Sequence, residues 1–154
     1  MAPMESPGRL LAIDLGAKRV GVAVSDELRI TIKPLAAIER RSWKDFLRRI
    51  VALSKTYEAR GLIIGLPLRL DGGEGEAAQD VRSVASKFQR SLDIPVYLQD
   101  ERLTSFDAAA NLRTSMSDLE IDAAIDSEAA ALILRDFIVS NDRPDASGLE
   151  PGSY

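Results

Sequence analysis

The chain has 154 residues, of which 45% are hydrophobic and 29% are charged, a composition typical of one globular domain. It contains no histidine and no cysteine, which excludes disulfides, imidazole or thiolate catalysis and zinc sites built from those residues. A formal net charge of −4 argues against nonspecific coating of nucleic acid, so any nucleic-acid contact is expected to be local. No secretory signal or membrane span is evident, so the expected location is cytoplasmic, without membrane contact.

Both ends of the chain are rich in small and turn-forming residues. Proline and glycine occur in residues 1–8, and proline, glycine, serine and aspartate dominate residues 140–154. Such segments bury little apolar surface, so we expect flexible tails at both ends. The folded domain is predicted to span residues 9–139.

The domain begins with three segments of extended pattern. An apolar run over residues 10–13 is followed by a turn over 15–19 and by a β-branched run over 20–25. A third extended stretch covers residues 30–35 after a short polar turn. Short connections favour antiparallel pairing, so these segments predict a three-stranded meander.

The rest of the domain alternates between helical and extended patterns. Apolar residues at helical spacing follow Ser42, a suitable N-cap, and predict an amphipathic helix over 42–57. Strand–helix–strand units require parallel pairing and right-handed crossovers. The predicted fold is therefore α/β, a mixed five-stranded sheet with three antiparallel and two parallel strands, flanked by helices. In chain order, the remaining predicted elements are strand 62–66, helix 74–92, strand 94–99, and helices 105–114 and 119–138.

Three carboxylates occupy positions from which this fold lets them meet. Asp14 follows the first strand and Glu101 follows the last, and ligands gather beyond the carboxyl ends of parallel strands. Asp126 lies in a largely apolar helical stretch, where a buried acid needs a partner, commonly a metal. Without imidazole or thiolate, carboxylates that hold hard divalent cations are the leading option. The sequence therefore indicates metal-assisted phosphate chemistry.

Charged residues close to these three carboxylates narrow the choice of site residues. Asp100 precedes Glu101, but successive strand residues point to opposite faces, and we favour Glu101 as the site acid. Asp122 lies one helical turn before Asp126 and is a candidate fourth carboxylate, whereas Glu128 is rotated away. Each acid also has a purely structural interpretation: a turn former, a salt-bridged strand end, or a solvated helix acid.

A family resemblance is carried by four ordered segments. They are IDLGAKRVGVAVSD, GLIIGLPLRLDGGEGEAA, VYLQDERLTS and IDSEAAALIL. Over residues 9–139 the chain resembles the YqgF family of the RNase H-like superfamily, which comprises Holliday-junction-resolvase-like proteins and pre-16S rRNA nucleases. The resemblance implies an RNase H-like fold and a hydrolase that cuts phosphodiester bonds. It also implies catalytic, metal-binding acids at Asp14, Glu101 and Asp126, with two Mg²⁺ or Mn²⁺ ions.

Basic residues near the acids are candidates for substrate binding. Lys18 and Arg19 follow the first acid, and Arg102 follows the second. The resemblance places the loop around residues 65–75 near the active cleft, which makes Arg69 a candidate phosphate contact, although a glycine-rich turn needs no function. We expect Asp122 to supply an additional metal ligand.

Two segments depart from the family pattern. The chain has Leu15-Gly16-Ala17 where the family usually carries Pro-Gly-Thr, and it loses a hydroxyl group there. The segment before the last acid, 118–122, is acidic where basic residues are often found. These departures affect the expected substrate binding more than the expected fold.

The resemblance favours a monomer that processes the 5′ end of precursor 16S rRNA in ribosome biogenesis, with a ribosomal particle as a candidate partner. The alternative substrate is a four-way DNA junction, whose symmetric cleavage needs a dimer. The first hairpin also resembles that of acetate-kinase, hexokinase or actin-like ATPases, but those proteins need two such domains. A further alternative is a ribosome-assembly or transcription-linked binding factor that does not cleave.

Overall fold

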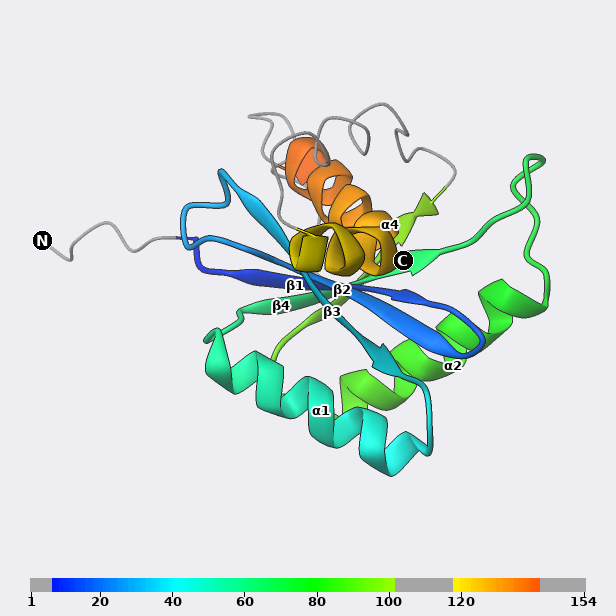
Figure 1. Cartoon of the computed structure of the whole chain (residues 1–154). Coiled ribbons are helices and arrows are strands. Elements are labelled where there is room, and N and C mark those ends of the chain that lie inside the picture. The colour runs from blue at the N-terminus through cyan, green and yellow to red at the C-terminus, as the bar shows by residue number, and fades with distance from the viewer. Residues whose placement is uncertain (1–6, 102–117, 142–154) are drawn as a thin grey trace, which may run out of the picture.

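The structure, a computed structural model, describes residues 7–101 and 118–141, with the side chains of 118–126 outside the description. One five-stranded sheet forms its centre, with α1 and α2 on one face and α4 on the other (Figure 1). The elements are β1 (Leu10–Leu15), β2 (Arg19–Ser25), β3 (Ile32–Glu39), α1 (Trp43–Thr56), β4 (Gly61–Leu66), α2 (Glu76–Ser91), β5 (Val96–Asp100) and α4 (Asp118–Asn141).

The sheet is mixed and its strand order is β3-β2-β1-β4-β5. β2 pairs antiparallel with both β1 and β3, whereas β4 pairs parallel with both β1 and β5. The predicted α/β fold with three antiparallel and two parallel strands is confirmed. The carboxyl ends of β1, β4 and β5 lie at one edge of the sheet, and β3 ends there too (Figure 1).

The third strand is longer than predicted. The extended pattern stops at Leu35, because Ala36 and Ala37 have low strand propensity, yet β3 continues to Glu39. Pairing with β2 overrides that propensity, because Arg19 pairs with Glu39 beyond a register shift between Val20 and Val22. The predicted helix over 105–114 lies outside the described residues, and α4 extends to Asn141.

Two apolar layers flank the sheet because strand side chains alternate between its faces. On one face, Leu11 and Ile13 pack with Phe46 of α1 and Phe88 of α2. On the other face, the small side chains of Ala12 and Ala23 lie in the layer that α4 completes. Five consecutive α4 residues, 130–134, are buried, as expected for a helix that is apolar on nearly all sides.

Local signals explain where α1 begins. The Ser42 hydroxyl accepts a hydrogen bond from the Asp45 amide at 3.1 Å, which satisfies one free donor of the first turn. The predicted N-cap is therefore confirmed. Among the described residues, no helix is both long and apolar enough to cross a membrane.

Candidate active site

Two of the predicted acids meet at the carboxyl edge of the sheet. Asp14 lies near the end of β1 and Glu101 directly follows β5, with β4 between these strands. Their side chains share a hydrogen bond on the face that α4 covers. Residues 87 positions apart in the sequence thus form one pair, because their strands are separated by a single strand.

Gly65 on β4 makes this contact possible. A Cβ at that position would lie 2.8 Å from Oε1 and 2.9 Å from Cγ of Glu101, and it would also collide with Cδ1 of Ile133. Only a residue without a side chain lets Glu101 cross β4 toward Asp14. Sequence reasoning did not assign this role, although a glycine inside a buried strand is itself a signal of close approach.

The acid pair has unusual electrostatics. Burial raises the pKa of Glu101 to about 8, and contact with Asp14 and the nearby charge of Asp100 act in the same direction. Two touching carboxylates repel when both are ionised, so the pair retains a proton or needs a cation. An all-oxygen donor set of this kind fits Mg²⁺ or Mn²⁺.

Among the side chains that the structure describes, no group of three or more acidic, histidine or cysteine residues is close enough to hold a metal. The side chains of Asp122 and Asp126 fall outside that description, as does Arg102. Both aspartates belong to α4, whose backbone runs across the face that carries the Asp14–Glu101 pair. Asp14 and Glu101 therefore form the described part of the candidate metal site.

A buried serine fixes α4 on the sheet next to Asp126. Ser127 is fully buried, its hydroxyl accepts a hydrogen bond from the Val22 amide at 2.9 Å, and it donates one to the Leu35 carbonyl at 2.6 Å. Val22 and Leu35 face each other across β2 and β3 beside the register shift. The serine hydroxyl thus satisfies two backbone groups at the irregular part of the sheet.

This contact lies beside the acid pair. Gly21, the residue before Val22, pairs with Asp14 on β1. Ser127 therefore fixes the helical turn that contains Asp126 to the strand that neighbours Asp14. The sequence analysis missed Ser127; the available signal was a single small polar residue within an alanine- and leucine-rich helix.

The predicted basic residues of the first hairpin are exposed, and the hairpin itself is braced. Lys18 and Arg19 lie in the connection that follows Asp14. Arg40 donates to the Gly16 carbonyl at 3.1 Å through Nη1 and to the Lys18 carbonyl at 2.8 Å through its backbone amide. The Arg40 guanidinium also makes two hydrogen bonds with Asp80 of α2, at 2.7 and 2.8 Å.

Arg69 lies in the loop that leaves β4 at the same edge of the sheet. Its side chain is 65% exposed and lies 3.9 Å from Asp71, a weak ion pair. A backbone bridge between Leu68 and Glu74 closes this loop, and Arg82 of α2 holds Glu74 at 2.6 Å. Arg69 is therefore free to turn toward a ligand at that edge.

Comparison with known proteins identifies the family. The model of the family described as "RuvX: Holliday junction resolvase" matches residues 8–140. The chain belongs to this family. The predicted family is confirmed.

Relatives in the RuvX family match almost their full length. A protein of Anaeromyxobacter sp. (strain K) is 39% identical over 131 residues, which cover 84% of this chain and 96% of the relative. Another, from Roseiflexus sp. (strain RS-1), is 38% identical over 139 residues, which cover 87% of this chain and 96% of the relative. Both carry the name "Putative pre-16S rRNA nuclease".

Solved structures share the fold at low sequence identity. Thermus thermophilus RuvC in complex with a Holliday junction substrate aligns with a TM-score of 0.54 and 12% identity, covering 86% of this chain and 95% of that one. The fowlpox virus Holliday junction resolvase aligns with a TM-score of 0.50 and 16% identity, and the alignment covers 86% of this chain and 98% of the resolvase. These likenesses support the predicted RNase H-like fold.

Proposed function

We propose that this protein is a metal-dependent endonuclease that hydrolyses phosphodiester bonds and processes the 5′ end of precursor 16S rRNA. The observation that carries the proposal is the contact between Asp14 and Glu101 at the carboxyl edge of the sheet. A chain without histidine or cysteine has few other means of activating water. The name shared by its relatives supports the choice of RNA.

The metal ligands in this proposal are Asp14, Glu101 and Asp126, with Asp122 as an additional ligand. Two Mg²⁺ or Mn²⁺ ions held by these carboxylates would supply an activated water and stabilise the leaving oxygen. The protein holds the carboxylates in place. Gly65 leaves room for Glu101, and Ser127 fixes the turn that contains Asp126.

Basic residues around this edge bind the substrate in the proposal. Lys18 and Arg19 follow Asp14 on the braced hairpin, and Arg69 lies on the loop after β4. Arg102 directly follows Glu101 in the sequence. Their positive charges offset the repulsion between phosphates and the acidic site.

The test is cleavage of a labelled 5′ fragment of precursor 16S rRNA, with Mn²⁺ or with a chelator. Wild-type protein should cut the fragment only with metal, and Asp14→Asn should not cut it at all. Asp93→Asn, which changes an exposed acid after α2, is the matched control and should retain wild-type rates. Equal rates for wild type and Asp14→Asn would contradict the proposal.

A second candidate is cleavage of four-way DNA junctions. The description of the matching family and the fold shared with two junction resolvases favour it. Symmetric cutting of a junction needs two copies of the site, whereas trimming one RNA end needs one. A junction offered in the same assay, together with the protein's mass in solution, separates the two activities.

A non-cleaving assembly factor is the remaining alternative, and a cellular test addresses it. In cells that lack the protein, the Asp14→Asn variant should fail to restore ribosome maturation. Full restoration by Asp14→Asn would show that binding, and not cleavage, is the function.

A further inference from the structure

Positive charge is concentrated in one short segment of an acidic chain. Residues 40–49, RRSWKDFLRR, contain five of the 20 lysines and arginines and only one acid, although the whole chain carries a net charge of −4. This segment covers the connection after β3 and the first half of α1. The rest of the chain contains 15 basic and 23 acidic residues, a net charge of −8.

The segment lies beside the hairpin that follows Asp14. Arg40 contacts the carbonyls of Gly16 and Lys18, so the segment is joined to the connection that carries Lys18 and Arg19 after Asp14. In Figure 1 the β1–β2 hairpin and the first turn of α1 lie at the same end of the sheet. We call Lys18, Arg19, Arg41, Lys44 and Arg48 the α1 basic surface.

Ion pairs do not neutralise this surface. Arg40 pairs with Asp80, Arg41 with Glu39, and Arg48 and Arg49 both pair with Asp45. The five basic residues of segment 40–49, which include Lys44, thus share three partner carboxylates, and Lys18 adds a further positive charge.

The exposed members of the surface contribute little to stability. The side chains of Arg41 and Arg48 are 61% and 78% exposed. Ion pairs at such exposure contribute about 0–1 kcal/mol, so folding alone does not account for the positive excess.

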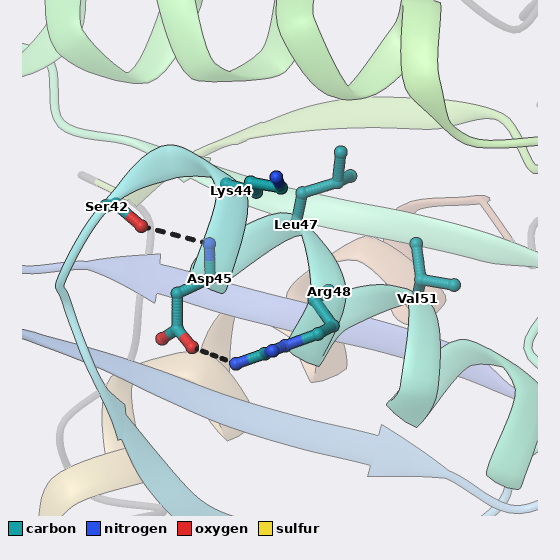
Figure 2. Close-up of a pocket in the computed structure, with 6 residues that line it drawn as sticks. All are labelled: Ser42, Lys44, Asp45, Leu47, Arg48 and Val51. Atoms are coloured by element: carbon teal, nitrogen blue, oxygen red, sulfur yellow. Dashed lines mark hydrogen bonds and ion pairs between the residues drawn. The ribbon is translucent and has the colours of Figure 1, made fainter.

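The outer face of α1 also carries a groove. Its volume is about 540 Å³, and it is lined by Ser42, Lys44, Asp45, Leu47, Arg48 and Val51. Figure 2 shows Lys44, Leu47 and Val51 along one side of the helix, with the Asp45–Arg48 pair along the other. The groove therefore combines an apolar floor with the positive charge of Lys44 on one side and the Asp45–Arg48 ion pair on the other.

We propose that the α1 basic surface, which lies on the opposite face of the sheet from α4, binds single-stranded RNA that passes the β1–β2 hairpin on its way to the acid pair, with phosphates on its lysines and arginines and a sugar or base on Leu47 and Val51. The proposal rests on the nuclease function argued above. Charge complementarity selects the occupant, because an acidic protein that brings phosphates to carboxylates needs a separate cationic surface to hold them. An apolar floor suits the uncharged faces of unpaired nucleotides.

Charge neutralisation at three positions tests the surface. The variant Arg41→Gln, Lys44→Gln, Arg48→Gln changes exposed side chains only. The matched control is Lys33→Gln, Lys55→Gln, Arg90→Gln, which removes the same charge from exposed positions at the start of β3 and the last turns of α1 and α2. Urea unfolding should show the same stability for both variants, because no buried group changes.

The readout is the affinity for a labelled 30-nucleotide single-stranded RNA in Ca²⁺, measured between 50 and 200 mM salt. Each phosphate contact contributes a slope of about 0.7 in log affinity against log salt, so the surface variant should lose a slope of about 2. Its affinity at 50 mM salt should fall at least tenfold, while the control keeps the wild-type slope. With cleavable RNA, the surface variant should raise KM and leave kcat unchanged.

The results separate this inference from the nuclease function. Equal binding and equal salt slopes for the surface variant and the control would overturn the α1 basic surface, even if wild-type protein cuts RNA. If wild-type protein binds RNA through the α1 basic surface but cuts no RNA, the result would support the binding surface and contradict the proposed nuclease activity.

Discussion

Glu101 reaches across β4 to share a hydrogen bond with Asp14, over a strand position that has no side chain. The two acids come from different strands, and their contact needs the small size of Gly65 as well as the parallel pairing of β1, β4 and β5. Burial beside a second carboxylate makes the ionised form of Glu101 costly. Five predictions concern this site and the way α4 is held against it.

The metal-free protein should lose stability as the pH rises from 4.5 to 8. The folded state raises the pKa of Glu101 from an ordinary value of 4.5 to about 8, so the folded protein binds more protons than the unfolded chain between these values. Its stability is therefore highest below the lower value and falls up to the higher one. Urea unfolding in a chelator at pH 5, 6.5 and 8 measures this slope.

Glu101→Gln should remove most of that pH dependence. At pH 8 in a chelator, the variant should be more stable than wild type by roughly 2 kcal/mol, allowing for partial solvent screening. Mg²⁺ should stabilise wild type most at high pH and have little effect on the variant. If the unfolding free energy of Glu101→Gln depends on pH as it does in wild type, other titratable groups cause that dependence.

Gly65→Ala should disable the site. The added methyl group would collide with Glu101 and with Cδ1 of Ile133, so both side chains must shift. We expect a loss of about 1–3 kcal/mol in unfolding free energy and at least a 100-fold loss of cleavage. Gly75→Ala is the matched control, because an added Cβ there meets nothing within 4 Å and the backbone φ is −100°. Comparable losses at both glycines would refute the steric argument.

Ser127→Ala should weaken the attachment of α4 to the sheet. The change leaves the Val22 amide and the Leu35 carbonyl without their described hydroxyl partner, at a cost of about 1–3 kcal/mol. The helical turn that contains Asp126 is then no longer held against the sheet. Half-maximal metal binding should therefore need a higher Mn²⁺ concentration, which calorimetry measures. Ser86→Ala, at an exposed position of α2, should change neither quantity. If the Ser127→Ala variant is less stable but binds Mn²⁺ with wild-type affinity, this serine acts only in folding.

Asp126→Asn should abolish cleavage, and Asp122→Asn should reduce it less. Both aspartates lie on α4, and they are one turn apart, but Asp126 precedes the anchored Ser127 directly. A more constrained carboxylate contributes more to a preorganised site. Single-turnover rates with Mn²⁺ measure both variants, with circular dichroism to show that the helix is retained. Equal losses would make Asp122 as important a ligand as Asp126.

Much of the fold follows from local sequence signals. Alternating and helical apolar patterns predict the five strands and place α1, α2 and α4, and Ser42 marks the start of α1. The rule that ligands gather at the carboxyl ends of parallel strands led to Asp14 and Glu101 without any knowledge of the pairing register. The strands, the helices and the meeting of these two side chains could be predicted because they depend on residues close together in the sequence or on general topology; their role as site acids stays a prediction.

The features that sequence reasoning missed depend on tertiary contacts. β3 extends through Ala36 and Ala37 because β2 offers hydrogen-bond partners, which no local propensity reveals. Gly65 matters because the side chains of Glu101, after β5, and Ile133, in α4, lie against it. Ser127 matters because it forms hydrogen bonds with backbone groups of β2 and β3. A single polar residue in an apolar helix becomes informative only when its partners are known.

The hydrogen bond between Ser127 and Val22 joins residues 105 positions apart, and it has a consequence for the order of assembly. Strands β1 to β5 lie before residue 101, so a growing polypeptide can pair them before α4 has left the ribosome. Until α4 docks, the sheet face that carries Leu10, Ala12 and Ile63 is open to water, and Asp126 is remote from Asp14. The contact between α4 and the sheet can therefore form only after all five strands have been made, and in the proposed site Asp126 joins Asp14 and Glu101 only at that step.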